Sequence, residues 1–288
     1  MEAKVFLHAQ AQLGEGPLWD DRRNCLFFVD IEGRKLHQIS PSGEEMASWD
    51  MPSRIGTVGL TRSDRLIVAL EDGLHLFDPA SGALEFFVQP ETDRTGNRGN
   101  DGKPDPAGNM WIGTMPMEQG KLGALYCVAP DGSSRRFIDG LGCANGMGWS
   151  PDHKTMYFID TPSRAVWAFD YDANTAEISN RRVVVDFSGF PQEEGGPDGM
   201  TVDAEGKLWV AQWGGMRVCR YDNLTGEKLM QVDVPAPCTS CPTFGGENLD
   251  TLFITTAGFG REKYPLAGDL FAAQVGVRGL PAFRFGKD

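Results

Sequence analysis

The segment PDGMTVDAEGKLWVAQWGGMRVCRYDNLTG, residues 197–226, contains the pattern that decides the fold. A polar turn at residues 204–207 precedes a short apolar run at residues 209–212, and a second apolar stretch at residues 218–221 ends in another turn at residues 222–226. Aromatic and β-branched residues that alternate with polar ones between turn residues are typical of β-hairpins and not of helices. We therefore interpret this segment as a series of short antiparallel strands.

The same order of signals occurs six times along the chain. The apolar runs begin at residues 27, 67, 111, 157, 209 and 253, so they are spaced by 40, 44, 46, 52 and 44 residues. Repeats of this length that each hold several strands are typical of β-propeller blades. The sequence therefore predicts an all-β fold, a six-bladed β-propeller. An irregular β-sandwich with chance periodicity is the alternative.

The repeats follow one another without a linker or a helical segment. We therefore expect residues 1–288 to form one domain. An uncovered sheet edge promotes aggregation, and a propeller removes the edge between its first and last blades by closing on itself. We expect Val5-Phe6-Leu7 to pair with the last repeat and to close the ring.

Charge and composition limit the possible partners. The 27 Lys and Arg residues are outnumbered by 40 Asp and Glu, which gives a formal net charge of −13. An acidic surface repels phosphate backbones and anionic lipids, so neither nucleic acid nor a membrane is expected as a partner. A signal peptide and an apolar run long enough to span a membrane are both missing, so a cytoplasmic protein is expected, as a monomer or small homo-oligomer.

Common catalytic motifs of other enzyme classes are missing from the chain. Neither HExxH nor GxSxG occurs, and the four histidines are isolated, so a Ser-His-Asp triad is not expected. Cys238-Thr239-Ser240-Cys241 is a CxxC motif, which could be a redox pair or half of a zinc site. No second CxxC and no thioredoxin-like pattern accompany it, so we expect a structural role, with Cys241 near the channel mouth.

A polar residue followed by glycine precedes the apolar run by 10 to 12 residues in four repeats. The pairs are Glu15-Gly16, Asp101-Gly102, Asn145-Gly146 and Asp198-Gly199. Equivalent positions in a closed ring surround one axis, so these side chains can meet at the mouth of the central channel. The alternative is that they only cap turns, since Asn-Gly and Asp-Gly are common turn pairs.

Glu15, Asn145 and Asp198 together predict a metal site. Two carboxylates that converge away from water repel each other, and a divalent cation removes that repulsion. All three side chains offer oxygen, which favours a hard ion such as Ca²⁺, Mg²⁺ or Mn²⁺, whereas zinc more often recruits His or Cys.

Several segments of the chain resemble the gluconolactonase family of sugar lactone hydrolases, the family that includes regucalcin, or senescence marker protein. The resemblance covers nearly the whole chain, in order. It is carried by Leu13-Gly14-Glu15-Gly16-Pro17, Asn97-Arg98-Gly99-Asn100-Asp101-Gly102, Pro197-Asp198-Gly199-Met200 and residues 145–152, 209–215, 244–246 and 264–268.

The resemblance implies hydrolysis of a sugar-acid lactone at one divalent metal in the channel mouth. The metal ligands that it implies are Glu15, Asn145 and Asp198, and the substrate-binding residues are Arg98, Asn100 and Glu118. Members of the family are associated with calcium, zinc, manganese and iron. We expect Ca²⁺, with Zn²⁺, Mn²⁺, Fe²⁺ and Mg²⁺ as alternatives.

The chain departs from the family pattern at positions that concern the substrate. Gly99 stands where a bulkier residue is common, Cys143-Ala144 precede Asn145, and the segment at residues 115–120 is short. The expected reaction uses the metal as a Lewis acid and Asp198 as the general base. The alternative function is a non-catalytic propeller that binds calcium or another metal.

Overall fold

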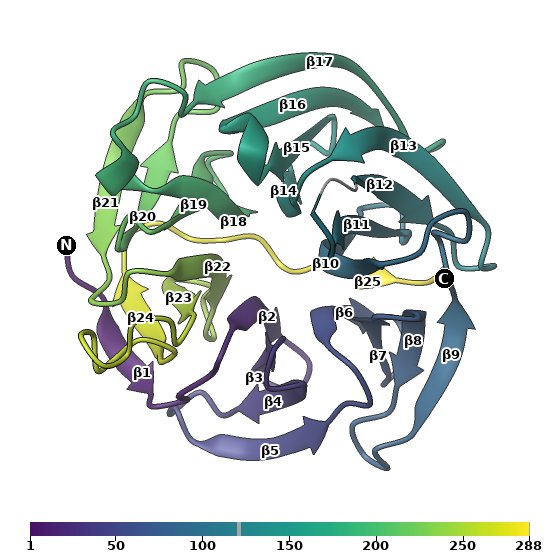
Figure 1. The fold of residues 1–288 in the computed structure, drawn as a ribbon, viewed down its shortest axis with the longest axis horizontal. Helices are drawn as coiled ribbons and strands as arrows, with labels where there is room; N and C mark the ends of the chain where they lie inside the picture. The colour runs from purple at the N-terminus through teal and green to yellow at the C-terminus, as the bar shows by residue number, and fades with distance from the viewer. Residues whose placement is uncertain (120–121, 288) are drawn as a thin grey trace.

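A computed structural model of the chain describes residues 1–119 and 122–287, which form six antiparallel sheets arranged as a ring (Figure 1). Within those residues there is no α-helix, and the only helical turns are two 3-10 segments, Thr161–Ser163 and Gln192–Glu194. The fold is a six-bladed β-propeller, which confirms the prediction. No helix of the described ranges is both long enough and apolar enough to cross a bilayer.

In blades 1 to 5 the first four strands follow one another in chain order from the axis to the rim, and in blade 6 the outermost strand is the N-terminal β1. Blade 1 consists of β2 (Gly14–Asp20), β3 (Cys25–Asp30), β4 (Lys35–Ile39) and β5 (Glu45–Asp50). Blade 2 consists of β6 (Ile55–Thr61), β7 (Leu66–Leu70), β8 (Gly73–Phe77) and β9 (Leu84–Val88). Blade 3 consists of β10 (Asn97–Pro104), β11 (Met110–Pro116), β12 (Gly123–Val128) and β13 (Ser134–Leu141).

The second half of the ring repeats this order. Blade 4 consists of β14 (Ala144–Trp149), β15 (Thr155–Asp160), β16 (Ala165–Asp172) and β17 (Glu177–Asp186). Blade 5 consists of β18 (Gly196–Val202), β19 (Leu208–Trp213), β20 (Arg217–Tyr221) and β21 (Lys228–Asp233). Blade 6 consists of β22 (Thr239–Gly245), β23 (Thr251–Thr256), β24 (Leu270–Gln274) and β1 (Lys4–Leu7).

The six apolar runs of the sequence form the second strand of each blade. These strands read as continuous apolar runs because neighbouring blades cover both of their faces. Every residue of β3 and of β7 is buried, for example. The first strands, β2, β6, β10, β14, β18 and β22, contact each other around the axis, so they are the innermost strands of the ring.

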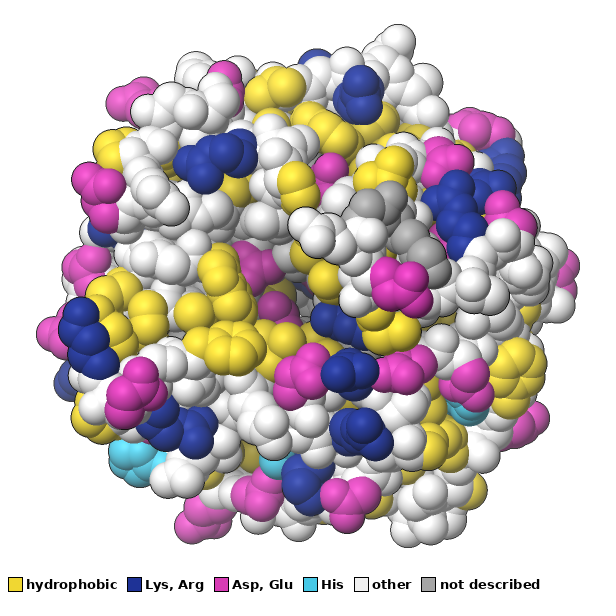
Figure 2. All heavy atoms as spheres, in the orientation of Figure 1, with side chains coloured by type: hydrophobic (Ala, Val, Ile, Leu, Met, Phe, Trp, Pro, Cys, Tyr) yellow, Lys and Arg dark blue, Asp and Glu magenta, His cyan; other side chains and the backbone are white. Residues whose placement is uncertain are grey.

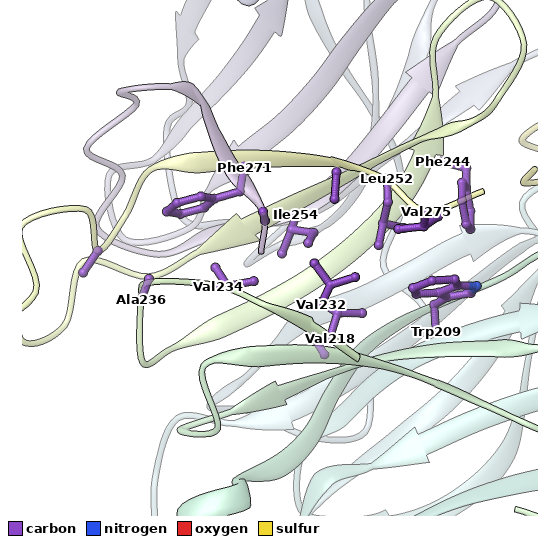
Figure 3. Packing of buried hydrophobic residues seen from close by; sticks show 14 residues of the cluster. Trp209, Val218, Val232, Val234, Ala236, Phe244, Leu252, Ile254, Phe271 and Val275 are labelled. Atoms are coloured by element: carbon purple, nitrogen blue, oxygen red, sulfur yellow. The ribbon is translucent and has the colours of Figure 1, made fainter. Parts of the chain in front are cut away.

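The hydrophobic core consists of separate layers, most of which lie between neighbouring blades. Figure 3 shows the layer between blades 5 and 6, in which Trp209 and Val218 of one sheet face Phe244, Leu252 and Ile254 of the next. Trp209 lies edge-on to Phe244, with 5.7 Å between ring centroids. Large residues that interlock in this way fix the angle between adjacent blades, and thereby the position of the innermost strands.

Both ends of the chain tie the ring together. The N-terminal strand β1 pairs antiparallel with β24 and forms the outer strand of blade 6. The C-terminal segment crosses the centre of the ring, as the yellow trace in Figure 1 shows, and its last strand, β25 (Arg284–Phe285), pairs parallel with β6. Residues 280–283 line a pocket together with the ends of the innermost strands, so this segment lies across one end of the channel.

Candidate metal and substrate site

The predicted ligands lie on irregular stretches of the innermost strands. In every blade the register between the first and second strand shifts at an equivalent place, including residues 15–18, 99–102, 144–147 and 197–200. Such β-bulges re-aim side chains and are common beside functional sites. Gly16 has a φ of +51°, a conformation that glycine adopts at no steric cost. The glycine after Glu15 therefore lets the strand bend where the carboxylate leaves it.

A pocket of about 280 Å³ opens where the innermost strands begin. Five of the six predicted site residues line it: Glu15, Arg98, Asn100, Asn145 and Asp198. Figure 2 shows this hollow at the centre of the face, with acidic side chains at its floor and hydrophobic ones along one side. The ring thus brings together residues that lie more than 180 positions apart in the sequence.

Glu118, the sixth predicted residue, lies three positions after Met115, which lines this pocket, and its role in substrate binding stays a prediction. It is exposed in the connection that follows β11, and it is not among the described residues that line the pocket. Of the short segment expected near the site, residues 115–119 are described, and Gly120 lies outside the described residues.

Glu15 and Asp198 form a like-charged pair. Burial raises the pKa of Glu15 well above its usual value, and repulsion from the Asp198 carboxylate raises it further. The pKa of Asp198 is raised by burial and then by repulsion from a third carboxylate, Asp101. Ionised carboxylates in such surroundings are costly unless a cation compensates them.

Asp101 was not among the predicted ligands, although it occupies the equivalent position in blade 3. It is buried; its Oδ1 accepts the Gly102 N–H at 2.8 Å, and its Oδ2 has no hydrogen-bond partner among the described residues. Burial raises the pKa of Asp101, and the charge of Lys103 opposes that shift. The Asp-Gly signal was visible in the sequence, but the sequence could not show that this carboxylate lies behind the pocket.

Hydrogen bonds hold the amide ligands in fixed orientations. Asn145 donates its Nδ2 to Thr161 Oγ1 at 3.0 Å, and that hydroxyl in turn donates to the Pro197 carbonyl at 2.9 Å. With the Asn145 nitrogen committed to Thr161, its carbonyl oxygen is the atom that remains for a cation. A hydrogen bond from Asn145 also lowers the pKa of Asp198, so these two side chains are neighbours.

Arg98 and Asn100 form a connected pair on β10. Arg98 Nη1 donates to Asn100 Oδ1 at 2.8 Å and to the Gly99 carbonyl at 2.9 Å. Asn100 Nδ2 donates to the Ala144 carbonyl at 2.8 Å. Both side chains are almost completely buried, so this pair joins blade 3 to blade 4 and presents the remaining guanidinium nitrogens of Arg98 as donors.

Burial raises the pKa of the cysteine thiols near the site. Cys143 lines the pocket, and burial raises the pKa of its thiol to about 12, which argues against a nucleophilic role. Cys241, expected near the mouth, is instead buried within the channel wall, where a Cβ at Gly199 would collide with its Sγ. All six cysteines, including Cys238, are free.

The residues of this pocket fit a hard divalent cation. Glu15, Asp198 and the Asn145 carbonyl supply oxygen donors, and the two carboxylates carry an uncompensated repulsion. Within the described residues, no three His, Cys, Asp or Glu side chains come together as a metal site. The donor set argues for calcium, magnesium or manganese more than for zinc.

Comparisons with known proteins identify the family. Residues 13–258 match the family model described as the SMP-30/Gluconolactonase/LRE-like region. The chain is 37% identical to the "Putative sugar lactone lactonase YvrE" of Bacillus subtilis over the full length of both, and 36% identical to the regucalcin of Gallus gallus over 95% of each.

A solved structure agrees with these sequence relatives. A calcium-binding protein, regucalcin, from Agrobacterium tumefaciens superposes with a TM-score of 0.92 at 31% identity, covering 99% of this chain and 97% of the other. A family model that spans most of the chain and full-length relatives above 30% identity establish the assignment. The chain belongs to the SMP-30/gluconolactonase/regucalcin family.

Proposed function

We propose that this protein hydrolyses a sugar-acid lactone to the corresponding aldonic acid in a metal-dependent reaction. The observation that carries the proposal is the convergence of Glu15, Asn145 and Asp198 in one pocket, with two carboxylates whose repulsion calls for a cation. The family supports the substrate class, because a relative that matches over its whole length bears the name "Putative sugar lactone lactonase YvrE".

Glu15, Asn145 and Asp198 would hold the cation through their oxygen atoms. A divalent cation supplies a Lewis acid, which polarises a carbonyl group and stabilises the negative charge that develops on its oxygen. Thr161 keeps the Asn145 amide turned so that its carbonyl is the available ligand.

Asp198 acts as the general base. Its carboxylate takes a proton from the water that attacks the lactone carbonyl carbon, and it returns a proton to the ring oxygen when the ester C–O bond breaks. Asp198 is suited to this role by position, because its carboxylate lines the pocket beside the other two proposed ligands. Arg98, whose Nη1 is already engaged, orients the substrate with its remaining nitrogens.

The test is an acid-release assay on protein stripped of metal by a chelator and then supplied with one divalent ion at a time. The lactones are those of gluconic, galactonic, xylonic and arabinonic acids. We expect stripped protein to be inactive and one ion, with Ca²⁺ the first candidate, to restore turnover. Asp198→Asn should keep the fold but lose ~10²-fold or more in kcat, a typical loss for a general base. Asp172→Asn, an exposed aspartate on β16, is the matched control.

Each result has a defined meaning. Full turnover by stripped protein would exclude the metal-dependent mechanism, and near-normal turnover by Asp198→Asn would remove that residue from the base role. Metal binding without hydrolysis of any lactone would favour the alternative, a propeller that only binds a metal.

A further inference from the structure

One side of the pocket is apolar. Leu13, Ile31, Trp213 and Phe259 line it together with the polar residues described above. Trp213 and Phe259 form an edge-to-face pair, with 5.9 Å between ring centroids and an interplanar angle of 65°. Phe259 is 52% exposed, although most large hydrophobic residues in the described part of the chain are buried. We call these four residues the apolar wall.

The apolar wall lies across the channel axis from Arg98 and Asn100. Trp213 ends β19 of blade 5, Phe259 follows β23 of blade 6, and Leu13 precedes β2 of blade 1, whereas the Arg98 and Asn100 pair lies on β10 of blade 3. Figure 2 shows the two sides: hydrophobic side chains gather along one flank of the central hollow, and a basic side chain lies on the opposite flank. A bound molecule therefore meets a polar and an apolar surface at the same time.

The amides on the polar side are already engaged, so the remaining nitrogens of Arg98 are the main donors left there for sugar hydroxyls. The Asn100 amide is engaged at both ends, by Arg98 and by the Ala144 carbonyl, and the Asn145 nitrogen is held by Thr161. Glu118, which the family resemblance assigned to substrate binding, does not line the pocket. A lactone with a hydroxyl on every carbon would thus place hydroxyls against the apolar wall without partners, which weakens binding.

We propose that the preferred substrate is a sugar-acid lactone whose end remote from the reacting carbonyl is apolar, such as a 6-deoxyhexonolactone, whose terminal methyl group packs on Trp213 and Phe259. This inference rests on the proposed lactone hydrolysis, since it names the substrate class of the same site. The carbonyl end faces the three metal ligands, and the methyl end covers the aromatic pair that otherwise remains exposed to water.

Aromatic side chains in sugar sites have a second use, which makes a different prediction. Their faces can pack against the C–H groups of a fully hydroxylated ring, in which case the terminal group is irrelevant. The two rings are inclined by 65°, so they do not form one flat surface on which a sugar ring could stack, and this geometry favours the deoxy substrate.

The experiment compares lactones that differ by a single oxygen atom. One pair is L-mannono-1,4-lactone with its 6-deoxy form, and the second is D-galactono-1,4-lactone with its 6-deoxy form, so that two ring stereochemistries are covered. The holoprotein, loaded with the ion that supports the highest rate, is assayed for kcat and KM. For at least one pair we expect kcat/KM to be ~10-fold higher for the 6-deoxy lactone, mainly through a lower KM, because an apolar pocket discriminates against an added hydroxyl only modestly.

Substitutions in the apolar wall then test whether it causes the preference for the 6-deoxy lactone. Phe259→Ala and Trp213→Ala should reduce the ratio of kcat/KM values, 6-deoxy over parent, to near 1, and Phe259→Leu should keep most of the preference. Phe86→Ala is the matched control, because Phe86 on β9 is a similarly exposed phenylalanine, 56% accessible, outside the residues that line this pocket. It should leave the ratio unchanged.

The outcomes separate this inference from the proposed function. If none of the lactones is hydrolysed, the proposed function fails. If both members of each pair are hydrolysed equally well, or if Phe259→Ala slows both members by the same factor, hydrolysis stands and the apolar-end substrate is wrong. Binding of the non-hydrolysable lactam analogue of the 6-deoxy substrate, measured by calorimetry, gives a second readout and should weaken in Phe259→Ala.

Discussion

At the scale of single residues, the pocket places carboxylates where folding alone would not favour them. Glu15 and Asp198 repel each other, and Asp101 behind them adds to the repulsion. Removing one negative charge reduces the repulsion in the metal-free protein, but it also removes a ligand of the proposed cation. Stability and function should therefore respond in opposite directions to the same substitution.

Glu15→Gln should stabilise the metal-free protein in a pH-dependent way. The folded state raises the pKa of Glu15, so the neutral carboxyl carries no penalty to folding stability below its usual pKa, near 4.5. As the pH rises toward and through the elevated pKa of the folded state, the carboxyl ionises and the free energy of unfolding of the metal-free protein falls. At pH 8, urea unfolding of chelated protein should show the variant more stable by on the order of 1 kcal/mol, a usual size for point substitutions. Near pH 4.5 the difference should vanish.

Two comparisons check this prediction. Glu227→Gln, at an exposed turn residue, should show no such pH dependence. Adding the activating ion should raise the melting temperature of the wild type but not that of Glu15→Gln. A variant that is less stable than the wild type at pH 8 without metal would contradict the charge repulsion described here.

At the scale of elements, buried aspartates organise the turns between first and second strands. Asp105 begins the turn that follows β10. Its Oδ2 accepts hydrogen bonds from Trp111 Nε1 at 2.9 Å and from Tyr171 OH at 2.7 Å. Asp203 does the same in blade 5, with Trp209 Nε1 at 2.9 Å and Arg220 Nε at 2.8 Å. In both blades one carboxylate joins a tight turn to a buried tryptophan of the following strand.

Asp105→Asn should destabilise the protein by about 2–3 kcal/mol. The new amide nitrogen faces either the Trp111 and Tyr171 donors or the backbone N–H donors that Oδ1 now accepts, so a buried donor loses its acceptor in both orientations. Urea unfolding measures the loss. Asp172→Asn is the control, because Asp172 caps an exposed turn through a bond from the Asn174 backbone. Equal losses in the two variants would show that the links to Trp111 and Tyr171 contribute little.

The elements also show where prediction from sequence ended. The six repeats and their second strands were predicted because burial on both faces leaves a continuous apolar run in the sequence. The bulges at residues 15–18 and 197–200 were not predicted, since a one-residue register shift has no residue signature of its own. The apolar wall was missed in part for a similar reason: Phe259 lies in a long connection without strand periodicity, and only the closed ring brings it beside Trp213.

At the scale of the whole molecule, a ring of sheets depends on its closure. The strand β1 comes from the opposite end of the chain from β24, which it covers, so the last blade is complete only when both ends meet. Val5 packs against the apolar layer between blades 5 and 6, whereas its neighbour Lys4 is exposed. One substitution at each position therefore tests the closure against a matched control.

Val5→Asp should lower stability by about 2–3 kcal/mol, because it places a charge against an apolar layer. Lys4→Asp introduces the same side chain one residue away and should change stability by less than about 0.5 kcal/mol. Urea unfolding gives both values, and size-exclusion chromatography reports association through an uncovered β24 edge. Equal stabilities in the two variants would mean that β1 is not needed to hold blade 6.

The position of the C-terminal segment bears on how substrate and product can move through the central channel. Four innermost strands, β2, β10, β14 and β18, run from the pocket that holds Glu15 and Asp198 to the far pocket that residues 280–283 line. The segment is anchored on both sides, by the Gly279 N–H to the Leu249 carbonyl and by the pairing of β25 with β6. Within the described residues the C-terminal segment thus covers the end of the ring opposite the carboxylates, so we expect substrate to enter and product to leave through the same mouth.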